Sequence, residues 1–215
     1  MDDRRARERM VESQIVARGV RNPALLVAMR EVPRHLFVPP DRADEAYEDR
    51  PVPIGEGQTI SQPYIVAAMT DVLAPAASHH LLEIGTGSGY QAAILSRLVR
   101  TVISIERRPT LAATALEALT RLGATNVRVI VGDGTQGYAP EAPYDRILVT
   151  AGAPVVPSAL TDQLADGGRL VIPVGDSAIQ RLRIIDRAGS VLHEREGEGC
   201  VFVPLIGQYG WPTKR

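Results

Sequence analysis

From residue 80 onward, short runs of apolar and β-branched residues alternate with segments of helical periodicity. Strands are predicted at 80–84, 101–106, 127–131 and 144–150, and the segment at 91–100 has the spacing of a helix. Strands that alternate with helices form a parallel sheet with right-handed crossovers. The pattern therefore predicts an α/β protein with a mostly parallel, doubly wound, Rossmann-like sheet.

The first third of the chain lies outside this alternation and forms an N-terminal helical addition. Gly19 ends a first predicted helix, and Asn22 with Pro23 has the form of an N-cap followed by proline at the first helical position. Helices are predicted at 4–18, 22–30 and 64–73, with an extended, proline-punctuated stretch at 32–40 and a glycine- and hydroxyl-rich loop at 54–63.

Later strands are expected at 164–174, 180–186 and 200–206, while 191–195 stays open between strand and loop. No linker, repeat or low-complexity tract divides the chain. We expect one domain over 1–215, in which 1–78 holds the N-terminal helices and an active-site loop and 79–215 holds the sheet and the C-terminal strands.

Composition narrows the class of function. The net charge of −1 offers no electrostatic case for binding nucleic acid or an anionic membrane. Cys200 is the single cysteine, so an internal disulfide is excluded, and no cluster of metal ligands is visible. The charged N-terminus lacks the apolar region of a signal peptide, and no apolar run has membrane-spanning length. We expect a soluble, cytoplasmic monomer without a metal, a nucleic-acid partner or a membrane partner.

The most informative segment follows the first strand of the sheet. Glu83 ends an apolar run, and Gly85, Gly87 and Gly89 alternate after it, ahead of a helix. Glycines let the backbone approach a ligand, and the N–H groups of the helix N-terminus point toward it. This is a binding loop for a nucleotide-like cofactor, or else a tight strand-to-helix turn without a ligand.

Other glycine motifs fit this loop less well. A dinucleotide fingerprint that starts at Gly85 needs glycine where Tyr90 stands, although the relaxed form Gly87, Gly89, Ala92 is present. A phosphate-binding P-loop lacks its Lys-Ser or Lys-Thr, and a nucleophile elbow around Ser88 lacks both flanking glycines. The remaining pattern, E-x-G-x-G-x-G, resembles motif I of S-adenosylmethionine (AdoMet) methyltransferases.

Two further polar groups follow the next strands. Glu106 ends the second strand, where an acid in doubly wound folds accepts hydrogen bonds from a ribose diol, or is simply solvated beside two arginines. Asp133 follows the third strand between Gly132 and Gly134, where a carboxylate can accept from an adenine amino group, or form a plain Asp-Gly turn. Ligands bind at such carboxyl ends of strands.

Four separated segments carry a more specific likeness. The loop PIGEGQTISQP at 53–63 is similar to the signature loop of the protein-L-isoaspartate O-methyltransferases, and VPRHLFVP at 32–39, DGGRLVIPVG at 166–175 and FVPL at 202–205 match in the expected order. The resemblance covers residues 10–211. It implies an AdoMet-dependent methyltransferase fold and methyl transfer to the free α-carboxylate of L-isoaspartyl residues in damaged proteins and peptides. The ester then closes to a succinimide, and S-adenosylhomocysteine is the other product.

The resemblance also implies roles for individual residues. Ser61 and Thr59 would be catalytic, and Ser61 is alternatively an N-cap of the helix that begins near Pro63. The acceptor peptide would contact Thr59, Ile60, Ser61, Val203 and Pro204, because Pro204 is typical of an edge strand, which can bind peptide backbone. The implied cofactor-binding residues are Ile60, Glu83, Gly85, Gly87, Ser88, Gly89, Glu106, Asp133 and Gly134.

Three other functions stay open at this stage. They are an AdoMet methyltransferase with another acceptor, an NAD-dependent oxidoreductase, and a cofactor-binding protein without turnover. The oxidoreductase lacks a Tyr-x-x-x-Lys pair, because Lys214 is the only lysine. The balanced charge and the lack of a strip of aromatic and basic residues argue against an RNA acceptor.

Overall fold

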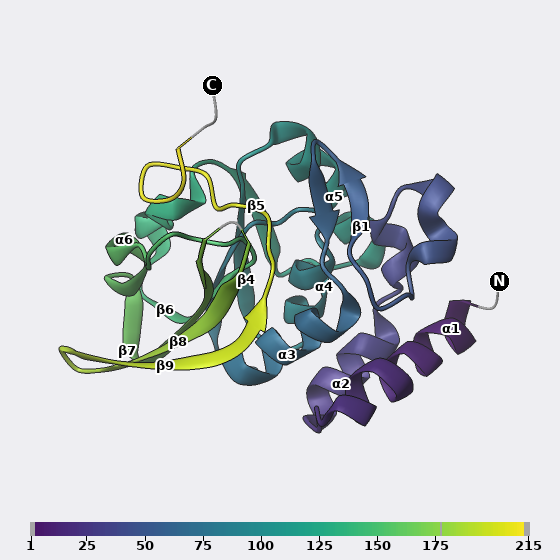
Figure 1. Ribbon diagram of the computed structural model, residues 1–215, viewed down its shortest axis with the longest axis horizontal. Helices are drawn as coiled ribbons and strands as arrows, with labels where there is room; N and C mark the ends of the chain where they lie inside the picture. The colour runs from purple at the N-terminus through teal and green to yellow at the C-terminus, as the bar shows by residue number, and fades with distance from the viewer. Residues whose placement is uncertain (1–2, 177, 213–215) are drawn as a thin grey trace.

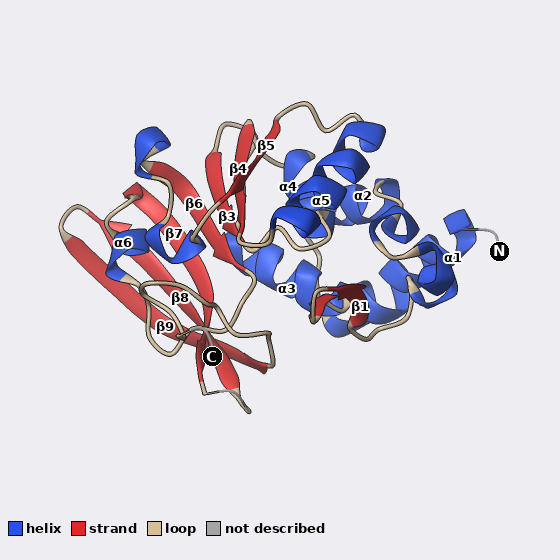
Figure 2. Ribbon diagram, turned by 90° about the horizontal axis from the view of Figure 1, so that it is seen from above, coloured by secondary structure: helices blue, strands red, loops and turns tan. Residues whose placement is uncertain are grey.

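A seven-stranded sheet forms the centre of the computed structural model, which describes residues 3–176 and 178–212 (Figures 1 and 2). The strand order is β5-β4-β3-β6-β7-β8-β9, parallel from β5 to β7 and antiparallel at β8 and β9. The order reverses between β3 and β6, which is the switch point where doubly wound sheets bind ligands. The strands span His80–Ile84 (β3), Thr101–Glu106 (β4), Val127–Val131 (β5), Tyr144–Val149 (β6), Leu164–Gly175 (β7), Gln180–Ala188 (β8) and Val191–Cys200 (β9).

The prediction was wrong at the end of the sheet. The last strand is β9, which covers the segment left open, whereas 201–206 follows it outside any strand. Because β9 is polar and exposed, it lacks an apolar pattern. The strand forms instead through its antiparallel pairing with β8. Ion pairs across the two strands add to this pairing, since Arg183 of β8 lies 3.3 Å from Glu194 and 2.8 Å from Glu196.

The N-terminal helices form largely where the pattern placed them. Helix α1, Asp3–Met10, continues through a π turn and a 3₁₀ turn to Arg18, and Gly19 ends it with φ of 96°. Helix α2 spans Pro23–Glu31, and the Asn22 side chain accepts from the N–H groups of Ala24 and Leu25.

Two segments between these helices and the sheet differ from expectation. The stretch at 32–40 is not fully extended, because a 3₁₀ turn occupies Arg34–Phe37 and another begins at Pro40. The expected loop at 54–63 is mostly a hairpin of β1, Val52–Gly55, and β2, Gln58–Ile60. Glu56 adopts φ of 53° and Gly57 φ of 69° at its tip, and such paired positive φ values suit a hairpin turn.

The two faces of the sheet are covered unequally (Figure 2). Helices α3, Pro63–Leu73, α4, Tyr90–Ser96, and α5, Pro109–Leu122, pack on one face, and their apolar side chains join those of the N-terminal helices in one core. The other face carries a second core under the short helix α6, Ser158–Thr161, and part of the C-terminal segment. The two cores thus bury apolar side chains on both faces of the sheet.

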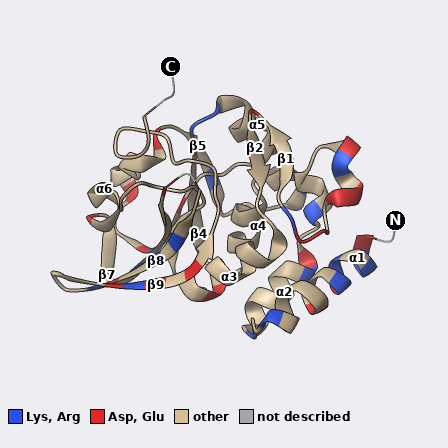
Figure 3. Ribbon diagram, viewed as in Figure 1, with Lys and Arg blue, Asp and Glu red and all other residues tan. Residues whose placement is uncertain are grey.

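Figure 3 shows acidic and basic residues together over the N-terminal helices, in keeping with the net charge of −1. None of the helices in the described part of the chain combines the length and the apolar character needed to cross a bilayer.

Candidate active site

The glycine loop after β3 takes a shape that side chains would prevent. Gly85 has φ of 96°, and a Cβ atom there would overlap the Thr150 hydroxyl at the end of β6. Gly87 has φ of 53°, and Gly89 has φ of 88° as the N-cap of α4. A Cβ atom on Gly89 would lie 3.2 Å from the Cβ atom of Ala115, so this glycine allows α4 to pack against α5 and does not line the cavity.

Glu83, which is among the predicted cofactor-binding residues, lies in β3 directly before the glycine loop. Its side chain is fully buried and lies outside the cavity lining. The Ser104 hydroxyl donates to Glu83 Oε2 and lies 2.6 Å from the Thr86 hydroxyl. Desolvation raises the pKa of Glu83 to about 8. The carboxyl group therefore positions the loop through Ser104 and Thr86.

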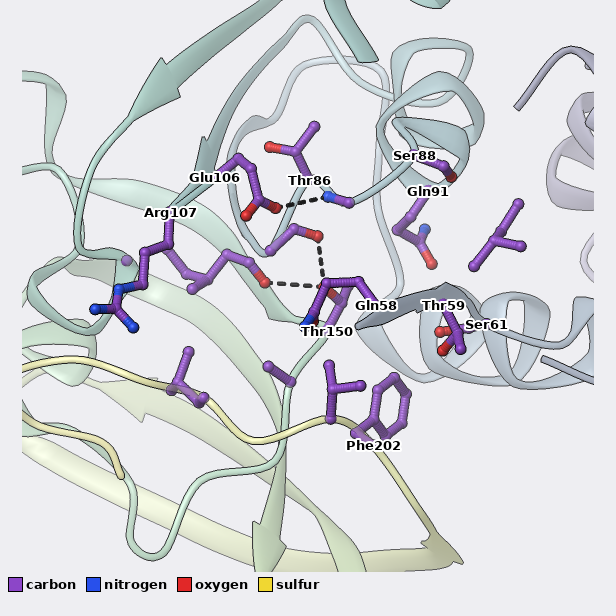
Figure 4. A pocket seen from close by; sticks show the side chains of 18 of the residues that line it. Gln58, Thr59, Ser61, Thr86, Ser88, Gln91, Glu106, Arg107, Thr150 and Phe202 are labelled. Carbon is purple, nitrogen blue, oxygen red and sulfur yellow. Dashed lines mark hydrogen bonds between the residues drawn. The ribbon is translucent and has the colours of Figure 1, made fainter. Parts of the chain in front are cut away.

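Glu106 lies where a ribose acceptor is expected. Its Oε2 atom accepts from the Gly87 N–H at 2.8 Å, and its Oε1 atom accepts from the Arg108 N–H at 2.9 Å. A carboxylate has about four acceptor positions, so these two bonds fix its orientation and leave capacity for two hydroxyl donors. The side chain lines the cavity opposite Thr59 and Ser61 (Figure 4).

The Asp133 carboxylate is engaged within the protein. It accepts four hydrogen bonds, from the Thr135 N–H and hydroxyl, the Gln136 amide and the Gln208 N–H. Burial opposes ionisation, but the Gln208 and Thr135 bonds outweigh it and hold the pKa of Asp133 below its usual range. These four bonds fill the acceptor positions of the carboxylate, so an adenine amino group would have to displace one of the donors. Asp133 also lies outside the lining of the cavity. Gly134 does line it, and a Cβ atom there would overlap Ile84.

The hairpin carries the predicted catalytic residues to the cavity. Thr59 and Ile60 belong to β2, and Ser61 follows directly before α3. Within the described residues, Ser61 does not cap α3: Gln62 is the N-cap residue without a side-chain bond. The Asp49 carboxylate instead accepts from the Tyr64 N–H at 3.3 Å. The Ser61 hydroxyl is therefore available to a ligand.

The segment after β9 crosses the carboxyl ends of the strands. Gly152 donates to the Val203 carbonyl at 2.8 Å and accepts from the Leu205 N–H at 2.8 Å, in a parallel bridge that needs no donor from Pro204. Val203 and Pro204 thereby line the cavity, although the expected strand is absent.

Two cavities adjoin at these residues. The first is lined by the glycine loop, Glu106 and the hairpin, and the second by the hairpin and 198–203. They share six residues, Thr59, Ser61, Ile65, Thr150, Phe202 and Val203. Figure 4 shows Thr150 and Phe202 near Thr59 and Ser61.

Sequence reasoning missed several polar residues that line the first cavity, among them Thr150 and Gln91. Thr150 donates to the carbonyls of Ile84, at 3.0 Å, and Gly85, at 2.6 Å. Thr150 could have been found from the sequence, because it is a polar residue at the end of a strand, which is the signal that identified Glu106. Gln91, buried in α4, donates to Thr70 at 2.9 Å, and its position only emerges from helix packing.

Metal ligands do not gather in the described part of the chain: no three His, Cys, Asp or Glu side chains there are placed to share an ion.

The model of the family "Protein-L-isoaspartate(D-aspartate) O-methyltransferase (PCMT)" matches residues 5–210. The chain belongs to this family.

Two curated members of the isoaspartate methyltransferase family match over nearly their whole length. A protein-L-isoaspartate O-methyltransferase of Methanoregula boonei is 58% identical over 95% of this chain and 94% of its own. The enzyme of Trichlorobacter lovleyi is 59% identical over 96% and 95%. A solved protein-L-isoaspartate O-methyltransferase shares 30% identity with a TM-score of 0.83, over 95% of this chain and 67% of its own. The fold is thus the Rossmann-like methyltransferase fold that the sequence predicted.

The cofactor expected for an isoaspartate methyltransferase fits the residues present. A putative family member from Plasmodium falciparum, solved with S-adenosyl-L-homocysteine, has a TM-score of 0.78 at 25% identity over 96% of this chain and 99% of its own. In this chain, Glu106 keeps free acceptor capacity, and Gly85 and Gly134 line the cavity where a Cβ atom would overlap Thr150 or Ile84. AdoMet is the cofactor of this family, and a carboxylate with free acceptor positions at the edge of the cavity fits the hydroxyl groups of a ribose.

Proposed function

We propose that this protein transfers the methyl group of AdoMet to the free α-carboxylate of L-isoaspartyl residues in damaged proteins and peptides, which initiates repair through a succinimide. The observation that carries the proposal is the junction of the two cavities. One has the residues expected around AdoMet, the other is open to a peptide, and Thr59 and Ser61 line both.

The residues at the junction match the needs of this reaction. A carboxylate has a pKa of about 4, so the acceptor is already an anion at neutral pH and requires no general base. AdoMet supplies an activated methyl group on a sulfonium cation. The protein therefore has to align the acceptor and exclude water. We assign the alignment to the Ser61 hydroxyl, with Thr59 beside it, because a neutral donor orients an anion without forming a tight ion pair.

We assign peptide binding to the hairpin and to Val203 and Pro204 on the segment after β9. An isoaspartyl residue differs from aspartate in its backbone, so a site that accepts many sequences should bind main-chain groups. The Phe202 N–H donates to the side-chain oxygen of Gln180 at 2.7 Å, and the Val203 carbonyl accepts from the Gly152 N–H. This fixes the wall against which a peptide backbone would lie.

The remaining expectations extend the proposal. We propose that Ile60, Gly85, Gly87, Ser88, Glu106 and Gly134 contact AdoMet, since all line the first cavity. Residues 1–78 would supply the acceptor loop and 79–215 the cofactor site of one domain. The monomeric state, the cytoplasmic location and the absence of nucleic-acid and membrane partners stay predictions from the sequence.

The decisive experiment compares two peptides that differ only in isoaspartate or aspartate at one position, with AdoMet labelled in its methyl group. We expect label on the isoaspartyl peptide alone, released by base as from a methyl ester. If neither peptide takes up label while AdoMet still binds, the protein is a cofactor-binding protein without this turnover. Label on both peptides would indicate a different acceptor.

Ser61→Ala tests the assigned catalytic role. Loss of a hydrogen bond to a charged group is worth about 1.5–3 kcal/mol, so we expect kcat to fall by about 10- to 100-fold. Stability should stay within about 0.5 kcal/mol, because Ser61 caps no helix here. Ser96→Ala, which removes a bond to the Ala93 carbonyl away from both cavities, is the control. A stability loss of about 1 kcal/mol with unchanged kcat would instead identify Ser61 as a cap.

A further inference from the structure

Arg34 is a charged residue in the interior of the N-terminal region. It begins the 3₁₀ turn Arg34–Phe37, and its side chain is fully buried. Burying a guanidinium is costly unless its donors are paired. Within the described residues no carboxylate forms an ion pair with it, and its Nη1 group is buried without a hydrogen-bond partner. Burial lowers the pKa of Arg34 only to about 10, so it keeps its charge at neutral pH.

The paired donors of Arg34 bind main-chain carbonyls from two distant segments. Nε donates to the Ala46 carbonyl at 2.6 Å, and Nη2 donates to the Ser61 carbonyl at 2.7 Å. Ser61 lies between the end of β2 at Ile60 and the start of α3 at Pro63, so neither element's regular hydrogen bonds include its carbonyl. Arg34 therefore supplies a fixed point for the backbone that carries the Ser61 hydroxyl.

The same guanidinium contacts the cofactor side of the site. Its Cζ atom lies 4.7 Å from the ring centroid of Tyr90, in cation–π contact. Tyr90 is the first residue of α4, directly behind the glycine loop, and lines the first cavity. Phe37 packs edge-on against the same ring at 5.7 Å. The Arg34 side chain thus contacts both the main chain at Ser61 and the ring of Tyr90, which lines the first cavity.

A role in stability alone accounts poorly for this arrangement. Burial removes the guanidinium from water at a cost in free energy, and its Nη1 group gains no hydrogen bond in return. The arginine fork, however, reaches two carbonyls and one ring at once, which neither an apolar residue nor the single ammonium of lysine can do.

We propose that Arg34 is a positioning residue, which fixes the main chain at Ser61 relative to Tyr90 in the lining of the first cavity. This inference rests on the role proposed for Ser61. It acts on the reaction through the orientation of Ser61 and touches no substrate itself. Its loss should therefore impair methyl transfer and peptide binding more than AdoMet binding.

Arg34→Lys tests the proposal, because it keeps the charge and loses one of the two carbonyl bonds. We expect kcat/KM for the isoaspartyl peptide to fall at least about tenfold, with the AdoMet Kd changed less than about threefold. Arg169→Lys is the matched control, because Arg169 also donates to a carbonyl, that of Val72 at 2.8 Å, and lies outside both cavities. It should keep the wild-type kinetic constants.

Two substitutions at Tyr90 provide a second, independent test. Tyr90→Phe keeps the ring under Arg34, whereas Tyr90→Leu removes it. We expect a smaller kcat/KM loss in the phenylalanine variant than in the leucine variant. We also expect the Arg34→Lys/Tyr90→Leu double variant to lose at least fivefold less than the product of the single losses, because the two side chains act as one unit.

The outcomes separate this inference from the proposed role of Ser61. If Ser61→Ala impairs turnover but folded Arg34→Lys has wild-type kcat and peptide KM, Arg34 is structural only and the inference is overturned. Equal losses in Arg34→Lys and Arg169→Lys would overturn it as well. If Arg34→Lys does not fold, equal kcat/KM in the two Tyr90 variants would refute the proposal. Unimpaired Ser61→Ala would instead refute the assigned role of Ser61.

Discussion

Glu83→Gln is expected to change how the stability of this protein depends on pH. Desolvation raises the pKa of the buried Glu83 carboxyl from 4.5 to about 8, against the opposing effect of the Ser104 bond. In the folded protein the group therefore keeps its proton at neutral pH, whereas in the unfolded chain it ionises. Glutamine has a similar shape and no proton to lose, so it removes this difference between the states.

The size of the effect follows from proton linkage. Below pH 4.5 both states hold the proton and Glu83 imposes no ionisation penalty. Between 4.5 and 8 the unfolded chain binds fewer protons, so stability falls with rising pH and the unfolding equilibrium constant grows about tenfold per pH unit. Between pH 5 and pH 8 the wild type should lose about 3 kcal/mol that the glutamine variant retains.

Urea unfolding of both proteins at several pH values measures this difference directly. The quantity to follow is the stability of Glu83→Gln minus that of the wild type. It should rise with pH, whatever constant offset arises from the altered bond to Ser104. Glu117→Gln, at an exposed position of α5, is the control and should show a flat difference. A flat difference for Glu83→Gln would refute the conclusion that the folded carboxyl is neutral at pH 7.

Three further outcomes test the site and its frame. Glu106→Gln should weaken AdoMet binding by about 10- to 100-fold in calorimetry, because a charged acceptor of the ribose is lost; an unchanged Kd would contradict this role. Gly134→Ala should abolish AdoMet binding or unfold the protein, whereas Gly132→Ala, with its Cβ 3.9 Å from Ile105, should be tolerated in the same assay. Asn22→Ala should cost about 1 kcal/mol in denaturant unfolding through the lost α2 cap, with turnover per folded molecule unchanged.

Local signals were sufficient for much of the fold. The parallel strands, the Asn22 cap and the glycine loop all rest on residues that are neighbours in sequence, where periodicity and backbone freedom act directly. Glu106 belongs to the same group, because its position at a strand end already places it at the ligand edge of an open sheet. The sequence of the loop at 53–63 was sufficient to indicate the family, although the sequence did not predict that this loop forms a hairpin.

Tertiary packing alone decided the rest. Nothing in the local sequence shows that Glu83 is sealed beneath the loop, that Asp133 is engaged by Gln208, or that Arg34 reaches Ser61. The strand β9 depends in the same way on its ladder with β8. The sequence determines where strands, caps and glycine turns form, because these depend on the residue and its near neighbours. Burial, carboxylate protonation and contacts between remote segments depend on which surfaces meet after folding, and those set the final geometry of the site.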